Sequence, residues 1–431
     1  MTKPDEQQTG EASGARAWAI TGLLFFFMMI NFADKAIIGL AGVPIMAELK
    51  LTPSEFGLVG SSFFLLFSIS AIVVGFIANR IQARWALLAM GILWALVQAP
   101  MLGTVSLELL IACRIVLGAA EGPAYPIAVH AAYKWFPDHR RAIPGAIIAQ
   151  GSALGVIIAI PVLSWIIAHY NWHYAFGALG LAGIVWSLAW ALVGKEGNIV
   201  DHVVTEGSKG GAHIPYRALL LNPTNLGCWC AGFGAYFGLA LVLAWFTPYL
   251  VEGLGIKQAL AGQLTALPFI ASSVVVVGGS WLSQRMTRAG VSSRRSRGVF
   301  SGTAISLGGI ALLLTPFASD TALKIALIVA GTTLPSIIYT LAPLIIGEIV
   351  PSAQRGAVLS INNAVATSAG IIAPLLMGSV IESAGSVALG YAHGFVICGA
   401  VTLAGGMLAL LLLHPERQKT RYAAGVATQA A

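Results

Sequence analysis

Long runs of apolar residues restrict the fold of this chain more than any other feature. Twelve runs reach the roughly 20 residues that a membrane-crossing helix needs. The predicted spans are residues 17–41, 56–78, 85–105, 107–133, 142–168, 173–194, 224–251, 260–283, 299–317, 322–349, 356–382 and 388–413. Strands of a transmembrane β-barrel are shorter, about 10 residues of alternating polarity. Because 57% of the residues are hydrophobic and only 10% are charged, we expect an all-α protein embedded in the lipid bilayer.

The basic residues predict the orientation of these helices. Of the 24 Lys and Arg residues, 19 fall on the side that both termini share, and three fall on the other side (Lys50, Lys257 and Lys324). Cytoplasmic loops carry the excess of basic residues. We therefore expect both termini in the cytoplasm and a multi-pass protein of a bacterial-type cytoplasmic (inner) membrane. The net charge of +7 then reflects topology, and no nucleic-acid partner is expected.

A long polar connection divides the predicted spans into six and six. The expected parts are a cytoplasmic tail (1–16), a first six-helix bundle (17–194), a central cytoplasmic loop (195–223), a second six-helix bundle (224–413) and a cytoplasmic tail (414–431). Residues 137–141 and 351–355 both read P-x-x-x-R, and each following helix contains a proline, at position 161 or 374. Such a repeat predicts two related halves.

The same repeat contains a pair of amides. Gln150 and Asn363 each lie eleven residues before the corresponding proline. Many transporters place their substrate site near the bilayer midplane, between two repeats. We therefore interpret the two amides as candidate substrate-binding residues, with adhesion between helices as the alternative.

Two loops carry a family resemblance. GFIANRIQAR, after the second predicted helix, resembles the G-x-x-x-D-R-x-G-R loop of the major facilitator superfamily, with Arg80 and Arg84 in place but Asn79 at the acidic position. The counterpart in the second half is SWLSQR, with Gln284 at the acidic position. The resemblance implies a major facilitator fold of two six-helix bundles and a gating loop formed by Asn79, Arg80, Arg84 and Gln284. Because Asn79 and Gln284 are neutral and depart from the family pattern, we do not expect gating to depend on an ion pair from these two positions.

Two further motifs are similar to those of one branch of that superfamily. NFADKAIIGLA (31–41) is similar to the first-helix signature N-[YF]-x-D-[RK] of the anion:cation symporters. CRIVLGAAEGPAYP (113–126) is similar to their fourth-helix signature R-x-x-x-G-x-x-E-x-x-x-x-P. The resemblance implies that Asp34 and Glu121 couple protons and that Lys35 and Arg114 hold a carboxylate.

The physics of these four residues leads independently to a functional interpretation. Each charge at a helix centre costs about 2.5–3.5 kcal/mol on insertion scales, so four would cost on the order of 10 kcal/mol if they faced lipid. They must therefore face protein or a watery cavity. Arg114 and Glu121 are two helical turns apart, about 10 Å, and Gly118 between them leaves room for a ligand or a close helix. The alternative is a structural ion-pair network between the first and fourth helices.

Other polar and aromatic residues in the spans are weaker candidates. Tyr236 and Trp245 in the seventh helix and Tyr339 in the tenth are candidates for contact with substrate, and core or lipid-facing positions are the alternative. His130 is a candidate proton relay or a satisfied interfacial histidine, and Glu348 near Arg355 suggests a gate or loop ion pair. The chain contains no phosphate-loop pattern and no H-x-x-x-H spacing in a span, so we expect no nucleotide, metal or other cofactor and no enzymatic activity.

These observations predict a monomeric secondary transporter that takes up a small organic carboxylate with protons by alternating access. The carboxylate would be an aromatic or other monocarboxylate, or a sugar acid. Because the predicted cavity-facing helices contain few polar residues beyond the two amides, the less hydroxylated acids are slightly favoured. The alternative is a proton-antiporting exporter of the same fold, for which two buried basic residues would serve no purpose.

Overall fold

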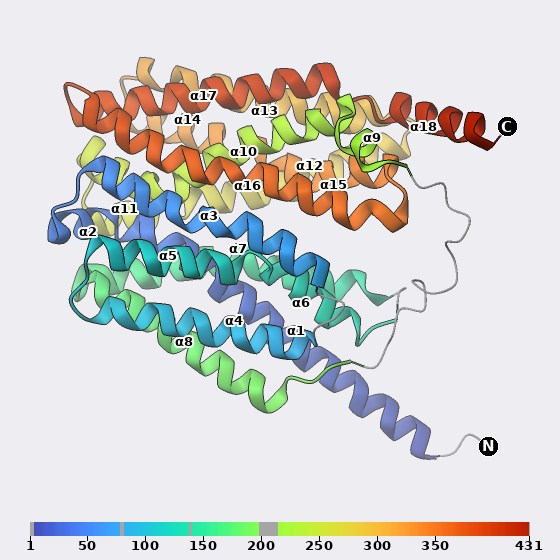
Figure 1. The fold of residues 1–431 in the computed structure, drawn as a ribbon. Coiled ribbons are helices and arrows are strands. Elements are labelled where there is room, and N and C mark those ends of the chain that lie inside the picture. Colours follow the sequence, from blue (N-terminus) through green and yellow to red (C-terminus); the bar gives the residue numbers. More distant parts are fainter. Residues whose placement is uncertain (1–3, 78–81, 138–139, 198–213, 431) are drawn as a thin grey trace.

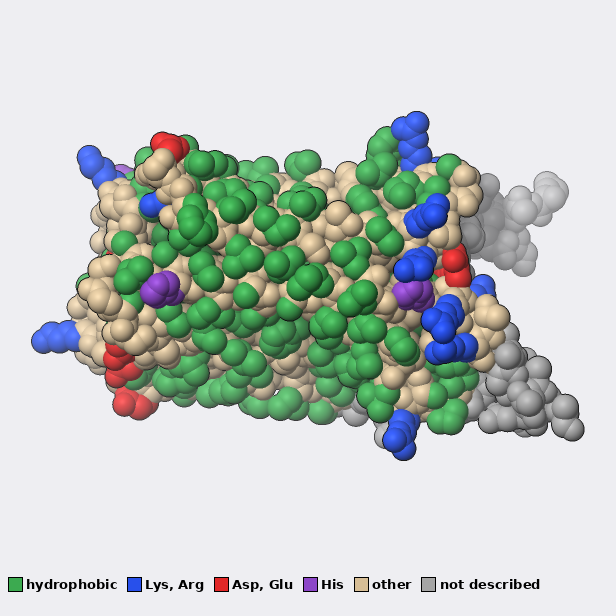
Figure 2. Space-filling view, turned by 90° about the horizontal axis from the view of Figure 1, so that it is seen from above, with side chains coloured by type: hydrophobic (Ala, Val, Ile, Leu, Met, Phe, Trp, Pro, Cys, Tyr) green, Lys and Arg blue, Asp and Glu red, His purple; other side chains and the backbone are tan. Residues whose placement is uncertain are grey.

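The computed structural model describes residues 4–77, 82–137, 140–197 and 214–430, which contain helices and no strand. Figure 1 shows the helices of the first half in a lower group and most of those of the second half in an upper group, with both chain termini at one end. The space-filling view has apolar side chains over the middle of the molecule and charged side chains at its two ends (Figure 2). This surface suits a protein that crosses a bilayer.

The described residues of the first half form eight α-helices. They are α1 (Pro4–Leu40), α2 (Gly42–Leu49), α3 (Pro53–Ile77), α4 (Ala83–Gln98), α5 (Leu107–Glu121), α6 (Ala124–Tyr133), α7 (Ala142–His169) and α8 (Trp172–Val193), with a 3₁₀ turn η2 (Ala99–Leu102) after α4. Polar side chains cap several helix starts: Ser106 accepts from the amide of Leu109 at α5, and Asn171 accepts from the amide of Tyr174 at α8. Such caps satisfy amides that have no partner within the helix.

In the second half, the part that the structure describes forms ten α-helices and four short 3₁₀ or π segments. They are α9 (Tyr216–Leu220), α10 (Pro223–Pro248), η5 (Tyr249–Gly253), α11 (Gln258–Leu264), α12 (Leu267–Arg288), η6 (Arg294–Val299), α13 (Phe300–Leu314), η7 (Thr315–Phe317), α14 (Thr321–Thr333), η8 (Leu334–Ile337), α15 (Ile338–Ile349), α16 (Ser352–Ser383), α17 (Val387–Leu412) and α18 (Pro415–Ala430). Part of the predicted central loop, residues 198–213, lies outside the described residues.

Eleven helical segments of the described chain are long and apolar enough to cross a membrane. They correspond to eleven of the twelve predicted spans. The remaining prediction, residues 107–133, is divided into α5 and α6, because the helix is interrupted at Gly122 and Pro123. Proline has no amide hydrogen and cannot donate to the carbonyl four residues earlier. The count of twelve spans and the cytoplasmic location of the termini stay predictions.

The two halves meet most closely where α3 lies beside α16 (Figure 1). Glycines bring the two backbones together: a Cβ on Gly57 would lie 2.5 Å from the carbonyl oxygen of Pro374, and one on Gly378 would lie 2.2 Å from that of Pro53. Ser61 accepts a hydrogen bond of 3.1 Å from the amide of Leu375. We call this contact the α3–α16 seam.

Candidate functional site

Four charged side chains from α1 and α5 meet in the interior of the first half. Asp34, Lys35, Arg114 and Glu121 are all buried. The Nζ atom of Lys35 lies 2.6 Å from Oε2 of Glu121, which makes an ion pair between the two helices. Nζ also donates a hydrogen bond of 2.5 Å to Oδ1 of Asn31, one turn earlier on α1. The structure therefore brings the sequence-predicted acids and bases together in one cluster.

Asp34 has a different partner from its neighbour Lys35, as expected for adjacent residues that point about 100° apart on a helix. Its Oδ1 accepts a hydrogen bond of 2.8 Å from Nε2 of Gln98, the last residue of α4. Gln98 is itself buried. Gln98 was not predicted from the sequence: it is an amide within an apolar span, as Gln150 and Asn363 are, but it lies outside the repeat that singled out those two residues.

Arg114 is held near both the backbone and an aromatic ring. An Nη atom donates to the backbone carbonyl of Asp34 at 3.3 Å, and the Cζ atom lies 4.6 Å from the ring centroid of Phe63. The buried Nε atom has no hydrogen-bond partner within the described part of the chain. An arginine in this setting retains donors that a carboxylate can accept.

Glu121 is the last residue of α5, immediately before the helix break. Its Oε1 atom accepts no hydrogen bond from any described residue. Close packing of α5 on α3 fixes its position: a Cβ on Gly118 would lie 1.8 Å from the carbonyl oxygen of Phe63, and one on Gly122 would lie 2.1 Å from that of Phe67. Of the two interpretations of Gly118, the structure supports the close helix.

Aromatic rings surround the charges and extend into the second half. Nζ of Lys35 lies 4.5 Å from the ring centroid of Phe32 and 5.4 Å from that of Phe67. The ring of Phe64 lies 5.7 Å from that of Tyr236 on α10, which lies 6.4 Å from that of Tyr339 on α15. The phenylalanines of FFLLF (63–67) were missed, because apolar residues in an apolar span give no distinguishing signal.

The two amides of the predicted repeat, Gln150 on α7 and Asn363 on α16, have exposed side chains within their helices. Tyr339 is also 37% exposed. Exposed polar groups at these depths are available to a ligand, but the predicted substrate contacts of these residues stay predictions.

Trp245 lies beside the α3–α16 seam. Its side chain is fully buried, its Nε1 donates a hydrogen bond of 2.9 Å to the carbonyl of Pro374, and its ring packs edge-on against Phe56 with centroids 5.1 Å apart. These contacts are typical of the core position that was the alternative for this residue, and its contact with substrate stays a prediction. The neighbouring Thr247 shares a 2.8 Å hydrogen bond with Thr265.

The predicted gating residues are divided between described and undescribed parts of the chain. Asn79 and Arg80 lie outside the described residues. Arg84 lies in the first turn of α4, where its amide donates to Glu196 at 3.1 Å and its guanidinium donates to the carbonyl of Ala191 at 3.3 Å. Gln284 is exposed on α12. Arg84 therefore contacts its own half of the molecule.

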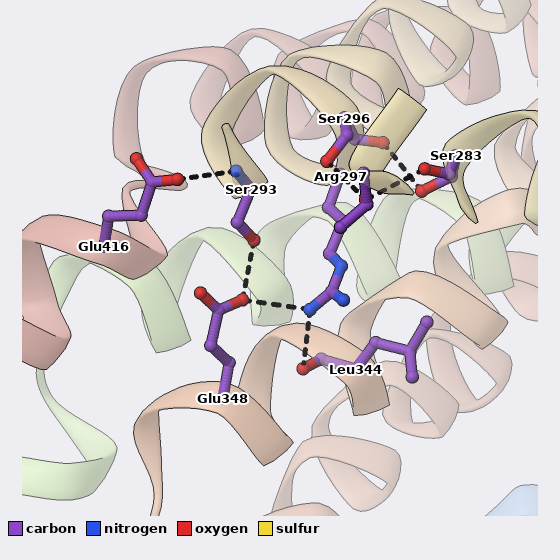
Figure 3. A network of polar contacts seen from close by, with 8 residues as sticks. Ser283, Ser293, Ser296, Arg297, Leu344, Glu348 and Glu416 are labelled. Atoms are coloured by element: carbon purple, nitrogen blue, oxygen red, sulfur yellow. Dashed lines mark hydrogen bonds and ion pairs between the residues drawn. The ribbon is translucent and has the colours of Figure 1, made fainter. Parts of the chain in front are cut away.

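Glu348 does form an ion pair at the end of α15, but with a different partner from the one suggested. Its Oε2 lies 2.9 Å from an Nη atom of Arg297 and accepts a hydrogen bond of 2.6 Å from the hydroxyl of Ser293 (Figure 3). Arg355 instead donates to the carbonyl of Val350 at 3.4 Å. Sequence proximity favoured Arg355, whereas the π-helix η6 brings Arg297 to α15. His130 is partly buried in α6.

Comparison with known proteins gives both a family and relatives. Residues 24–334 and 289–429 match the family model described as Major Facilitator Superfamily. The D-galactonate transporter of Escherichia coli is 26% identical over 422 residues, which cover 93% of this chain and 96% of that protein. A probable sulfoacetate transporter of Cupriavidus necator is 29% identical over 416 residues, which cover 92% and 93%.

Solved structures have the same fold. A bacterial homolog of the human lysosomal transporter Spinster, in an inward-facing conformation, has a TM-score of 0.77 at 17% identity, with 94% of this chain and 98% of that chain covered. A D-xylose-proton symporter has a TM-score of 0.75 at 15% identity, with 93% and 99% covered.

Proposed function

Since the chain belongs to the major facilitator superfamily, we propose that it is a secondary active transporter that takes up a small organic carboxylate together with protons. The substrate class comprises aromatic and other monocarboxylates and sugar acids. Protons are the coupling ions, and the two helical halves provide alternating access. Relatives named as D-galactonate and sulfoacetate transporters support an organic anion as the substrate.

The buried ion pair between Lys35 and Glu121 carries this proposal. Removing one partner of a buried pair leaves an uncompensated charge, which is strongly unfavourable. If Glu121 takes up a proton, Lys35 loses its anionic partner, and a substrate carboxylate can replace it. Proton and substrate anion then enter together, because each alone would leave a buried charge without a partner.

Arg114 and Asp34 extend the same scheme. The unsatisfied Nε of Arg114 can donate to the second oxygen of a substrate carboxylate, since guanidinium groups bind carboxylates through two parallel donors. Asp34, held by Gln98, supplies a second carboxyl group that can carry a proton. We assign Asp34 and Glu121 to proton coupling and Lys35 and Arg114 to the substrate carboxylate.

The surroundings of the cluster suggest how the rest of the substrate is held. Phe64, Tyr236 and Tyr339 form a series of aromatic rings from α3 to α15. Gln150 and Asn363 supply amides for hydrogen bonds. A wall with many rings and few polar groups favours a substrate body with few hydroxyl groups, because unpaired hydroxyl groups are costly to bury.

An exporter that exchanges a drug-like compound for protons is the second candidate, since Asp34 and Glu121 would serve it equally well. Two buried basic residues beside the acids favour the carboxylate, because a neutral or cationic compound would gain nothing from them. The two functions also differ in the direction of substrate movement relative to protons.

Ligand-dependent thermal stability tests the substrate class. The purified full chain is heated with D-galactonate, benzoate, lactate or pyruvate, beside Arg114→Ala and the exposed-site control Arg217→Ala. A ligand at 100 times its Kd adds about 2.7 kcal/mol to the stability of the folded form. We expect one acid to stabilise the wild type and Arg217→Ala but not Arg114→Ala. Stabilisation only by neutral or cationic compounds would favour the exporter.

Transport in proteoliposomes tests the coupling. We expect an inward proton gradient to drive accumulation of the acid that stabilises the protein. Uptake that does not respond to the gradient would contradict symport while leaving the carboxylate assignment intact.

A further inference from the structure

One face of α12 changes from apolar to basic along its length. Val274, Val277 and Trp281 are followed by Arg285 and Arg288, at spacings of three or four residues that keep all five on one side of the helix. The first three are 68%, 61% and 59% exposed. The 15 residues from Val274 to Arg288 rise about 21 Å along the helix axis, which matches a lipid acyl chain with its headgroup. The Cζ atom of Arg285 lies 5.5 Å from the ring centroid of Trp281.

A basic surface pocket follows directly after this stripe. The chain turns at Gly290, where φ is 81°, and enters the π-helix η6. A pocket of about 860 Å³ lies at this turn, lined by Gly290, Ser292, Arg294, Arg295 and Glu416 among others. Residues 285–297 contain five arginines and no acidic residue. Figure 2 shows Lys and Arg side chains gathered beyond the apolar belt, at one end of the face in view.

The nearby acids already have partners. Glu348 pairs with Arg297 at 2.9 Å, and Oε1 of Glu416 accepts a hydrogen bond of 2.6 Å from the amide of Ser293 (Figure 3). Arg294 and Arg295 are exposed, and within the described chain their side chains form no hydrogen bond or ion pair. Their guanidinium groups can therefore bind an external anion.

We propose that this surface binds the phosphate headgroup of an anionic phospholipid. Arg294 and Arg295 contact the phosphate from the pocket, Arg285 and Arg288 contact it from α12, and the acyl chains lie along Val274, Val277 and Trp281. Basic pockets between membrane helices bind acidic lipid headgroups, and tryptophan is enriched at the membrane interface. This assignment does not depend on the proposed transport function.

Titration of the purified full chain with short-chain lipids, followed by native mass spectrometry, tests the proposal. The probes are dihexanoyl-phosphatidylglycerol, dihexanoyl-phosphatidylcholine and glycerol phosphate, which carries the phosphate without acyl chains. The variant is Arg294→Gln/Arg295→Gln. Two controls remove the same charge elsewhere: Arg140→Gln/Arg217→Gln lies on the same predicted membrane side, and Lys257→Gln/Lys324→Gln lies on the opposite one.

We expect phosphatidylglycerol to bind on the order of tenfold more tightly than phosphatidylcholine. This preference should disappear in Arg294→Gln/Arg295→Gln and persist in both controls, with unchanged circular dichroism in all variants. Equal binding of the two lipids, or an equal loss in the same-side control, would overturn the proposal. Glycerol phosphate binding as tightly as the lipid would assign the pocket to a soluble anion instead.

Discussion

Lys35 on α1 and Glu121 at the end of α5 form a buried ion pair of 2.6 Å that joins two helices of the first half. The pair has few additional partners: the amine of Lys35 also contacts Asn31, and Oε1 of Glu121 accepts no hydrogen bond within the described residues. Each member therefore depends on the other for compensation of its charge.

Separate and joint replacement of these residues should give strongly non-additive stabilities. We expect Lys35→Met alone to destabilise the protein by about 3–5 kcal/mol, because it leaves Glu121 as a buried charge. Lys35→Met/Glu121→Gln should recover most of this loss. Thermal unfolding of the detergent-solubilised proteins gives the order of stabilities, with Glu108→Gln on the same helix as the control. Equal losses in the single and double variants would contradict a compensating pair.

Replacement of Gln98 should weaken both the stability of the protein and transport. Its amide donates to Oδ1 of Asp34 at 2.8 Å, and both side chains are buried. Gln98→Leu leaves this buried oxygen without its donor, at a cost of about 1–3 kcal/mol, and should lower both the thermal unfolding midpoint and the rate of proton-driven uptake in proteoliposomes. Gln258→Leu, which removes an amide bonded to the backbone carbonyl of Leu40, is the control and should not lower uptake. Unchanged uptake in Gln98→Leu would leave Gln98 only a packing role.

A methyl group at Gly118 should force α3 and α5 apart. The new Cβ would lie 1.8 Å from the carbonyl oxygen of Phe63, and overpacking of this kind costs about 1–3 kcal/mol. Gly118→Ala should lower the thermal unfolding midpoint and weaken carboxylate binding. At Gly278 on α12 nothing lies within 4 Å of the new Cβ, so Gly278→Ala should not lower the midpoint. Matching midpoints for the two variants would show that the helices accommodate the methyl group.

Glu196, which lies outside the membrane-spanning segments, should make the stability of the protein depend on pH. Burial alone would raise the pKa of Glu196, but hydrogen bonds from Lys134 and from the start of α4 lower this pKa below its ordinary value of 4.5. Its stabilisation is therefore present above pH 4.5 and lost as the pH falls through the lowered pKa. Glu196→Gln should cost about 1 kcal/mol at pH 7, because the neutral amide no longer pairs with Lys134 and accepts a weaker hydrogen bond from the amide of Arg84 than a carboxylate does.

The difference in stability between wild type and Glu196→Gln should become smaller as the pH falls below 4.5. Lys134→Gln should reproduce only part of the loss at pH 7, because the bond from the amide of Arg84 remains. Thermal unfolding at several pH values measures both effects. If the unfolding midpoints of wild type and Glu196→Gln differ by the same amount at acidic pH as at pH 7, this account is contradicted.

The membrane spans and the burial of the four charged residues could be predicted from the sequence, because both follow from the free energy of transfer from water to the bilayer. Eleven spans correspond to apolar runs of sufficient length, and charges that cannot face lipid had to lie in the interior. The end of helix α5 after Glu121 was harder to predict from the sequence. A proline can kink or end a helix, and the neighbouring packing decides between the two outcomes.

Partner choice was harder to predict than burial. Glu348 binds Arg297 rather than Arg355, because the geometry of a π-helix is not visible in residue spacing. Gln98 and the phenylalanines 63 and 67 approach the charged cluster from other helices. Their contribution depends on how the helices pack, which local patterns do not specify.

The α3–α16 seam also has a mechanical consequence. Glycines allow its two backbones to touch, so much of its attraction is van der Waals contact, and a gap of 0.5–1 Å already removes roughly a quarter to a half of such an attraction. Few hydrogen bonds, such as that between Ser61 and Leu375, reach across it. Because this attraction acts over so short a distance, no partly separated arrangement of α3 and α16 is stable. The two halves should therefore separate at this seam in one abrupt step rather than by gradual widening of the contact.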